Sequence, residues 1–401
     1  MFQKLVNHND DIKRLVEKGY AVAFDSNYLV IRDIPYLDAQ LQLRSGVFVT
    51  KLVFIDQERV IQEDHQVFFA GSSPYNLDGS LITNLSDRLS PLTLGEACND
   101  FVVERAFSNK PRINGQLQQF KDFFEKIESY TAIISGPAVE KYQANPYTFR
   151  TVQDTQEESV FKFHDTMTSR AEITDLSAKF KNDVIAIIGL GGTGAYVLDF
   201  LVKTPVREIR AFDLDPYHIH NTYRSPGRLD ASELGKSKAE VYYSRYENFR
   251  TGLSIKPKFI DASSVAELES VTFAFVCVDK GSSRSGIFDL LIAQNISFID
   301  VGMGLNRNKH GSLNGMLRAT HYPVEYGEEM KGMGLAELAD NPNDMYRANI
   351  QIGELNALNA CLAVIRFKQL RGFYFEENPY LHLLFGIGDL HITGESSFNE
   401  D

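Results

Sequence analysis

The sequence has few cysteines and no excess of basic charge. Its 401 residues include only three cysteines, Cys98, Cys277 and Cys361. These are too few and too scattered for a disulfide framework or a four-thiolate zinc site. Acidic residues outnumber basic ones by 53 to 41, which gives a net charge of −12. Nucleic acids and anionic membranes both require basic patches, so we expect neither among the main partners.

The sequence also lacks long hydrophobic runs, internal repeats and low-complexity tracts. No window approaches the roughly 18 apolar residues of a membrane span. Charged residues interrupt residues 1–20 too often for the apolar core of a signal peptide. We therefore expect a soluble protein of a reducing compartment, the cytoplasm. With 43 % hydrophobic residues, the 401-residue chain is long enough for two domains, each with its own core.

The first half of the chain has the pattern of a small α+β domain. A short helix is expected from about residue 10 to Gly19, and another near 115–130, where apolar residues recur at helical spacing. Turn-forming residues separate the β-rich runs between them. These runs are 21–24, 28–32, 47–55 and 66–70. We assign residues 1–138 to this domain, with partner recruitment as a candidate role, and the polar segment 139–165 to a linker.

The second half, residues 166–390, has a different pattern. Continuous apolar runs are typical of strands that are buried on both faces of a sheet. They occur at 183–189, 208–215, 273–279 and 296–302. Helical stretches alternate with them, which predicts a Rossmann-like α/β domain with a doubly wound, mostly parallel sheet. A long amphipathic stretch at 348–370 is expected to pack across the sheet, and residues 391–401 to form a frayed tail.

A glycine-rich loop, GLGGTG at residues 189–194, joins the first of these strands to a helix. Glycine allows a tight turn and a close approach to a phosphate, which the free N–H groups of the helix then bind. Asp213 ends the next strand, where a carboxylate can accept a hydrogen bond from a ribose hydroxyl. This pattern predicts a nucleotide site that fits NAD as well as ATP. The candidate glycines are Gly189, Gly191, Gly192 and Gly194.

A set of polar residues after the glycine loop favours ATP over NAD. Cleavage of ATP between its α- and β-phosphates needs cations for the developing charge and a carboxylate for Mg²⁺, whereas hydride transfer needs neither. Suitable side chains follow two of the expected strands. They are Asn221, Arg224, Lys236, Lys238, Asp279 and Arg284. Lys238 is preferred over Lys236 because of the KAE sequence that it begins.

Three spaced motifs and the glycine loop together resemble the ThiF/MoeB superfamily, which includes the adenylation domains of ubiquitin-activating enzymes. The motifs are DxDxxxxxNxxR at Asp213–Arg224, GKxKAE at Gly235–Glu240 and VDxxxxR at Val278–Arg284. The resemblance covers roughly residues 165–370. The first half of the chain does not match the usual pattern of the family.

The resemblance implies ATP-dependent adenylation of the C-terminal glycine carboxylate of a small ubiquitin-like or sulfur-carrier protein, with release of pyrophosphate. The glycine loop would lie beside the phosphates and Asp213 would bind the ribose. Asn221, Arg224 and Lys238 would contact the phosphates, and Asp279 would hold Mg²⁺. The expected setting is a bacterial ubiquitin-like conjugation system, with a conjugating enzyme as a further candidate partner.

The resemblance also implies a homodimer in which an arginine before the first strand reaches the partner's ATP, and Arg170 is the candidate. Family members with structural zinc carry paired CxxC motifs; this sequence has none, so no zinc is expected. The crossover region at 303–347 has no cysteine, so no cysteine thioester is expected on this chain. Thr320 and Ser312 are the remaining oxygen nucleophiles of that region.

Alternatives to this interpretation remain at several positions. Asp215 could serve as a second ribose or metal group, or simply form a turn. His218 and His220 flank Ile219 in the manner of metal ligands, but no third ligand is suggested. At the level of function, the alternatives are an NAD-dependent oxidoreductase that uses the same glycine loop, and a non-catalytic nucleotide-binding scaffold.

Overall fold

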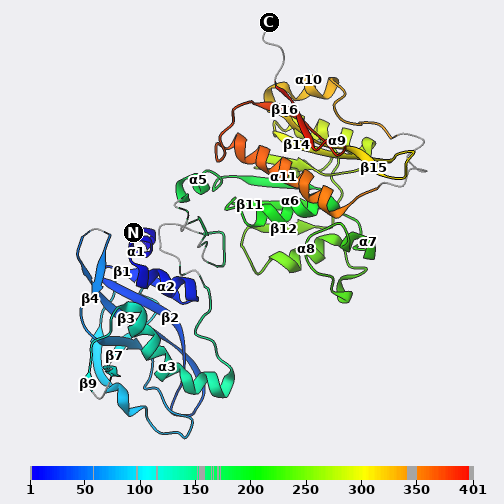
Figure 1. Ribbon diagram of the computed structural model, residues 1–401. Coiled ribbons are helices and arrows are strands. Elements are labelled where there is room, and N and C mark those ends of the chain that lie inside the picture. The colour runs from blue at the N-terminus through cyan, green and yellow to red at the C-terminus, as the bar shows by residue number, and fades with distance from the viewer. Residues whose placement is uncertain are drawn as a thin grey trace. The chain divides into compact units, whose positions relative to one another are not determined.

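The computed structural model divides into two compact units, Met1–Glu172 and Ile173–Asp401 (Figure 1). Within the described ranges, no helix has the length and apolar composition that crossing a membrane requires. The structure describes residues 2–56, 58–95, 98–113, 116–150, 152, 159–163, 165, 167–168, 171, 173–340 and 350–396.

The first unit is built on an antiparallel sheet with the strand order β1-β2-β3-β5-β7-β6, and β4 pairs with β3. Its strands are β1 (Ala21–Asp25), β2 (Tyr28–Leu37), β3 (Leu43–Phe54), β4 (Val60–Gln62), β5 (Gln66–Ala70), β6 (Arg88–Leu92) and β7 (Val103–Ser108), with a separate pair β8 (Arg112–Ile113) and β9 (Gln116–Leu117). Its helices are α1 (Phe2–His8), α2 (Asp10–Lys18) and α3 (Phe123–Tyr142), with a 3-10 turn at Thr83–Leu85.

Helices α2 and α3 of this unit close its main core. Helix α2 buries Ile12, Leu15 and Val16 on one face, and it ends at Gly19, whose φ of 103° suits glycine. Helix α3 contacts α2 and β2, and aromatic side chains of β3 and β5 fill the space beneath. The predicted α+β domain is confirmed as an antiparallel sheet covered by helices.

The predicted second helix of this unit was wrong at its start. Residues 116–117 form β9, and α3 begins only at Phe123. The reason is a local N-cap: the Asp122 carboxylate accepts a hydrogen bond of 2.8 Å from the backbone N–H of Glu125, which satisfies a donor of the first turn. Helix α3 also continues to Tyr142, into the segment that we assigned to a linker.

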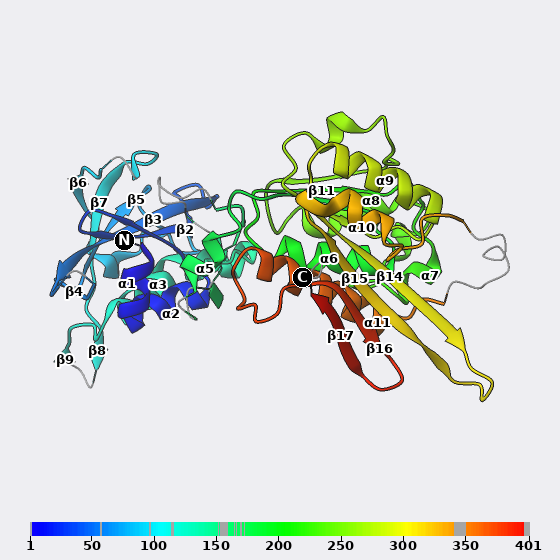
Figure 2. The same cartoon turned by 90° about the horizontal axis from the view of Figure 1, so that it is seen from above.

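The second unit contains an eight-stranded sheet with the order β12-β11-β10-β13-β14-β15-β16-β17. The strands from β12 to β14 are parallel, and the pairs from β14 to β17 are antiparallel. Figure 2 shows the two antiparallel hairpins side by side. The strands are β10 (Val184–Ile188), β11 (Glu208–Phe212), β12 (Leu253–Lys256), β13 (Phe273–Val276), β14 (Phe298–Arg307), β15 (Leu313–Tyr322), β16 (Tyr380–Gly386) and β17 (His391–Ser396).

Helices cover both faces of this sheet, as the continuous apolar strand β10 requires. Ile185 and Ile187 pack in one core with α6 and α11, while Val184, Ala186 and Ile188 pack in a second core with α9. The predicted doubly wound, mostly parallel sheet is therefore confirmed. The helices are α5 (Thr174–Ala178), α6 (Gly192–Val202), α7 (Ile219–Thr222), α8 (Lys238–Tyr246), α9 (Gly281–Ala293), α10 (Gly327–Gly332) and α11 (Gly353–Leu370), with 3-10 turns at Ala231–Glu233, Val265–Leu268 and Val324–Tyr326.

Candidate nucleotide-binding site

The carboxyl ends of β10, β11 and β13 meet at one edge of the sheet. From β10 the chain crosses to β11 and β12 on one side, then returns to β13 on the other. Ligands of doubly wound sheets bind at such a reversal, outside the carboxyl ends of the strands. The segments that follow these strands contain the glycine loop, Asp213 and Asp279. The structure thus brings the principal predicted site segments to the same edge.

Packing within the domain requires three of the four candidate glycines. A Cβ atom on Gly189, whose φ is +94°, would lie 2.7 Å from the carbonyl oxygen of Cys277. A Cβ on Gly194 would lie 1.9 Å from the carbonyl oxygen of Gly189, and one on Gly192 would lie 2.4 Å from the side chain of Asn356. These glycines let β10, β13, α6 and α11 approach one another closely.

Gly191 is different, because the fold does not need a glycine at this position. It is the N-cap of α6, with φ −68° and ψ −154°, and a Cβ there would meet no atom within 4 Å. Its small size therefore leaves open space in front of the first turn of an 11-residue helix. The free N–H groups and the positive end of the helix dipole at such a turn favour a phosphate.

Asp213 and Lys238 form a buried ion pair beside this loop. The Asp213 carboxylate accepts hydrogen bonds of 2.7 Å from the backbone N–H of Leu190 and 2.9 Å from that of Asp215. The ammonium group of Lys238 lies 3.2 Å from Asp213 and 2.9 Å from the exposed carboxylate of Asp215. Asp213 therefore also fixes the glycine loop, and Lys238 connects both acidic residues of the DxD motif.

A capping box positions Lys238 at the start of α8. The Ser237 side chain accepts a hydrogen bond from the N–H of Glu240, whose carboxylate in turn accepts one from the N–H of Ser237. The helix therefore begins at Lys238, with its side chain 6 % exposed. Lys236, by contrast, is exposed.

Asn221 is buried and serves the local backbone. Its side-chain oxygen accepts a hydrogen bond of 2.7 Å from the N–H of His218. This contact closes the capping box of the short helix α7. The ring centroids of His218 and His220 lie 5.6 Å apart. The pKa of His220 is lowered by desolvation and by nearby positive charges, which include Arg224 and Lys238.

Arg224 has an unsatisfied donor. Its Nε atom is buried, and among the described residues it has no hydrogen-bond partner. Buried donors without an acceptor are rare in proteins and mark a strained or ligand-binding position. Gly353, the first residue of α11, packs against this segment: a Cβ there would lie 3.0 Å from the carbonyl oxygen of Tyr223.

Asp279 is exposed between β13 and α9, and no described residue forms a hydrogen bond or ion pair with it. Its neighbour in the motif, Arg284, is buried instead. Arg284 donates to Asp300 at 3.1 Å and to the carbonyl oxygen of Val278 at 2.5 Å, and Asp300 also pairs with Arg318. Arg284 thus supports the backbone next to Asp279 and is not available to a phosphate.

Helix α11 contributes a site residue that the sequence analysis missed. Asn356 is 1 % exposed, its side-chain oxygen accepts a hydrogen bond of 2.9 Å from the Thr193 hydroxyl, and its amide donates to the carbonyl of Ile352. A polar amide inside an otherwise apolar helical run was the available signal. We had assigned this helix only a packing role.

The nucleophile candidates lie in contrasting surroundings. Thr320 is fully buried between Arg318 and His382, whose Nδ1 lies 2.8 Å from its hydroxyl, whereas Ser312 is exposed in a hairpin turn. Burial raises the pKa of each of the three cysteine thiols, and a thiol is unreactive until ionised.

Two further predicted features concern metal and the partner subunit. The described residues contain no group of three or more His, Cys, Asp and Glu side chains that could hold a metal ion. A lone carboxylate such as Asp279 still fits Mg²⁺, which binds one or two protein carboxylates and the phosphates of its substrate. Arg170 lies outside the residues that the structure describes.

The fold and the loop define a Rossmann-like nucleotide-binding domain. Residues 166–315 match the ThiF family, and residues 10–166 match the family described as Domain of unknown function (DUF6791). Residues 166–315 therefore form a ThiF family domain. The resemblance inferred from the motifs is confirmed.

A curated relative and two solved structures are also similar. The tRNA threonylcarbamoyladenosine dehydratase of Escherichia coli (strain K12) is 28 % identical over 99 residues, which cover 24 % of this chain and 37 % of that protein. The chain thus spans little more than a third of that relative. The structure of E. coli MccB with ATP is 15 % identical, with a TM-score of 0.43, over 61 % of this chain and 72 % of that one. The structure of PaaA is 14 % identical, with a TM-score of 0.45, over 78 % and 98 %.

Proposed function

We propose that this chain binds ATP at the carboxyl edge of its parallel sheet and adenylates the C-terminal carboxylate of a small ubiquitin-like protein. The observation that carries the proposal is the unsatisfied Nε of Arg224, in the same domain as the open N-terminus of α6 at Gly191. An oxyanion is the ligand that both features fit. The ThiF family match favours ATP over the NAD alternative.

In the proposed reaction, a carboxylate oxygen of the small protein attacks the α-phosphorus of ATP. The bond between the α-phosphorus and the bridging oxygen breaks, and pyrophosphate leaves with the electron pair. The positive side chains of Arg224 and Lys238 offset the charge on the leaving group, and the first turn of α6 binds phosphate oxygens. No group of the enzyme is acylated, because catalysis consists of positioning and charge stabilisation.

Lys238 and Asp279 have separate roles in this proposal. Lys238 is held by Asp213 and Asp215, so it is oriented before a phosphate arrives. Asp279 holds Mg²⁺, which supplies positive charge to the phosphates. In a homodimer, Arg170 acts on the ATP of the partner subunit. The proposed setting is a bacterial ubiquitin-like conjugation system, in which a conjugating enzyme is a further partner.

The test is ATP–pyrophosphate exchange with the purified chain and a small protein that ends in glycine. Wild type should exchange, and Asp279→Ala should not, while its unfolding transition stays unchanged because the side chain is exposed and unpartnered among the described residues. Normal exchange by Asp279→Ala would remove Asp279 from the mechanism. Absence of exchange in wild type, together with nicotinamide cofactor binding, would support the oxidoreductase instead.

The curated relative suggests a second candidate, an activity on a modified tRNA nucleoside like that named for the dehydratase. The net charge of −12 speaks against it, because tRNA binding depends on basic surface. A gel-shift titration with tRNA separates the two candidates. Binding at physiological salt would favour the tRNA activity, and its absence favours a protein substrate.

A further inference from the structure

The segment between β11 and α8 carries Asn221 and Arg224, yet it has little regular structure. Its only helices are the four-residue α7 and the 3-10 turn at Ala231–Glu233. Short helices of this kind are not stable alone. Backbone hydrogen bonds between Tyr217 and residues 235–236 close the ends of the segment, and side-chain contacts add to them around Arg224.

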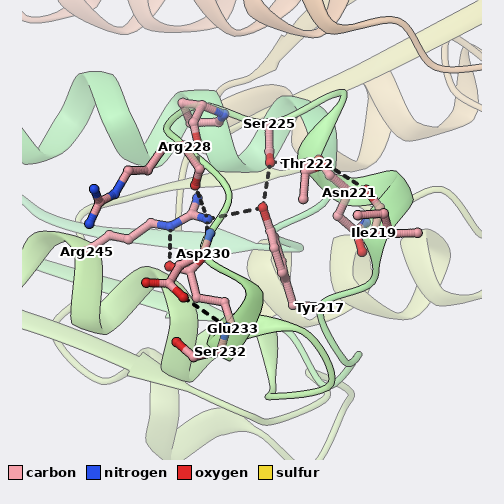
Figure 3. Close-up of polar contacts among 11 residues, drawn as sticks. Tyr217, Ile219, Asn221, Thr222, Ser225, Arg228, Asp230, Ser232, Glu233 and Arg245 are labelled. Atoms are coloured by element: carbon pink, nitrogen blue, oxygen red, sulfur yellow. Dashed lines mark hydrogen bonds and ion pairs between the residues drawn. The ribbon is translucent and has the colours of Figure 1, made fainter.

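Arg245, on α8, makes these contacts (Figure 3). Its guanidinium donates to both carboxylate oxygens of Glu233, at 3.0 and 2.6 Å. It also donates to the carbonyl oxygens of Pro226 and Arg228, each at 3.0 Å, and to the Tyr217 hydroxyl at 3.2 Å. One side chain thus holds four points of the segment, on both sides of Arg224.

A second chain of contacts leads from Arg245 through Tyr217 and Ser225 to Asn221 (Figure 3). The Tyr217 hydroxyl lies 3.4 Å from the Ser225 hydroxyl, which donates at 2.7 Å to the carbonyl of Asn221. The same carbonyl accepts the backbone N–H of Arg224 at 3.2 Å. The guanidinium also lies 5.2 Å from the Tyr217 ring centroid, where the ring face attracts a cation.

We propose that Arg245 is a positioning residue, which holds the Tyr217–Glu233 segment so that Arg224 points to the phosphates of the nucleotide. This inference rests on the proposed function for its ligand. Whether Arg245 holds the segment can be measured in the absence of any ligand. Lysine cannot replace the residue, because an ammonium group lacks the planar fork that reaches several acceptors at once.

The chain offers a matched control in Arg210 on β11. Its guanidinium also pairs with one glutamate, Glu208, and donates to two carbonyl oxygens, those of Glu267 and Glu269. The side chains of Arg210 and Arg245 are 18 % and 14 % exposed. Arg210 therefore has the same kind of contacts but secures a different segment, which carries none of the site residues.

The first experiment is hydrogen exchange on the full chain without nucleotide. In Arg245→Lys and Arg245→Ala, amides of residues 217–233 should exchange about tenfold faster or more, while the strands of the sheet keep their protection. Arg210→Lys should leave residues 217–233 unchanged. Wild-type protection of this segment in Arg245→Ala would overturn the inference, whatever the enzyme activity.

The second experiment is a double-mutant cycle in ATP–pyrophosphate exchange. Arg245→Lys should lower kcat/KM about tenfold in an otherwise wild-type chain, and much less in an Arg224→Ala chain, because it acts through Arg224. Arg210→Lys should have no effect in either background. Equal losses in both backgrounds would overturn the positioning role. If wild type does not exchange, the proposed function fails, and the hydrogen-exchange result still decides whether Arg245 holds the segment.

Discussion

The hydroxyl of Thr193 donates a hydrogen bond of 2.9 Å to the side-chain oxygen of Asn356, which lies 163 residues later in the chain. Thr193 belongs to the glycine loop, and Asn356 to the helix that crosses the sheet. This bond fixes the first turn of α6, where we expect phosphate to bind, to the start of α11. The two helices otherwise meet through apolar side chains.

We expect Asn356→Leu to weaken both the fold and nucleotide binding. Leucine has a similar volume, but it leaves the Thr193 hydroxyl without its acceptor and removes the side-chain donor to the Ile352 carbonyl, which keeps the backbone N–H of residue 356. The free energy of unfolding should fall by about 1–3 kcal/mol, as measured by urea denaturation, and the affinity for ATP should fall as well. Thr193→Val removes the other partner, so the double variant should lose less than the sum of the two. If the losses of stability in the two single variants simply add in the double variant, the Thr193–Asn356 hydrogen bond does not couple the two residues.

Arg224→Ala should reduce ATP–pyrophosphate exchange about 10²-fold or more, in line with the loss of single charge-stabilising donors elsewhere. The stability of the chain should change little, because the Nε of Arg224 has no partner among the described residues.

Lys238→Ala should lower stability as well as exchange, unlike Arg224→Ala. It removes the partner of a buried carboxylate, so it should lower both exchange and the free energy of unfolding. Equal melting temperatures of Lys238→Ala and wild type would contradict the proposed contribution of Lys238 to stability.

The proposed homodimer can be tested by subunit mixing. Arg170→Ala and Asp279→Ala chains should each be inactive alone, because each lacks one part of every composite site. A mixture should regain partial exchange, since one of the two sites in a mixed dimer is intact. Light scattering measures the oligomeric state directly. A strictly monomeric chain would exclude the arrangement.

No cysteine of this chain should form a thioester. Burial raises the pKa of all three thiols, and adenylation needs no thiol. A chain with Cys98, Cys277 and Cys361 replaced by alanine or serine should therefore still exchange pyrophosphate. The check is a non-reducing gel after incubation with ATP and the small protein. An adduct that reductant cleaves would refute this expectation, and one that only hydroxide cleaves would point to the exposed Ser312 before the buried Thr320.

His321 should make the second unit less stable in mild acid. Burial, with Arg366 and Arg371 nearby, lowers the pKa of His321 to about 3, whereas an unfolded histidine titrates near 6.5. The unfolded chain therefore takes up the proton first, and stability is lost as the pH falls from about 6.5 toward 3. Between pH 6.5 and 5 this loss amounts to about 2 kcal/mol.

The measurement is urea denaturation of wild type and His321→Phe across that range, with the exposed His391→Gln as the control. The slope of stability against pH should be smaller in His321→Phe and unchanged in His391→Gln. Equal slopes in all three chains would show that His321 takes up its proton equally in the folded and unfolded states, which would contradict the prediction.

The sequence predicted the centre of the ThiF domain well, because its signals are local. An apolar run buried on both faces needs only neighbouring residues to be recognised, and GLGGTG follows it directly. Asp213 and Lys238 were placed by motif spacing, and they lie within an ion-pair distance of 3.2 Å. The sequence does not distinguish Gly191 from the other three glycines. The difference depends on which atoms surround the point that a Cβ atom would occupy.

Long-range partners explain what the sequence did not predict. Asn356 serves the glycine loop from 163 residues away; its amide stands out in an apolar helical run, but no local pattern identifies Thr193 as its partner. The spacing of Arg284 from Asp279 suggested a phosphate ligand, but the Arg284 guanidinium forms an ion pair with Asp300 on β14. The start of α3 was misplaced because the apolar periodicity extends past the cap at Asp122.

The pairing of β17 with β16 has a practical consequence for anyone who shortens the chain. Residues 391–401 were expected to form a tail, yet His391–Ser396 form the outermost strand of the eight-stranded sheet. A chain that ends at residue 390 would leave the backbone donors and acceptors of β16 exposed along a new edge. An exposed edge can pair with strands of other molecules, and β16 (YLHLLFG) is more apolar than β17 (HITGES), so trimming this end should make the protein more prone to aggregation, even though the nucleotide site is untouched.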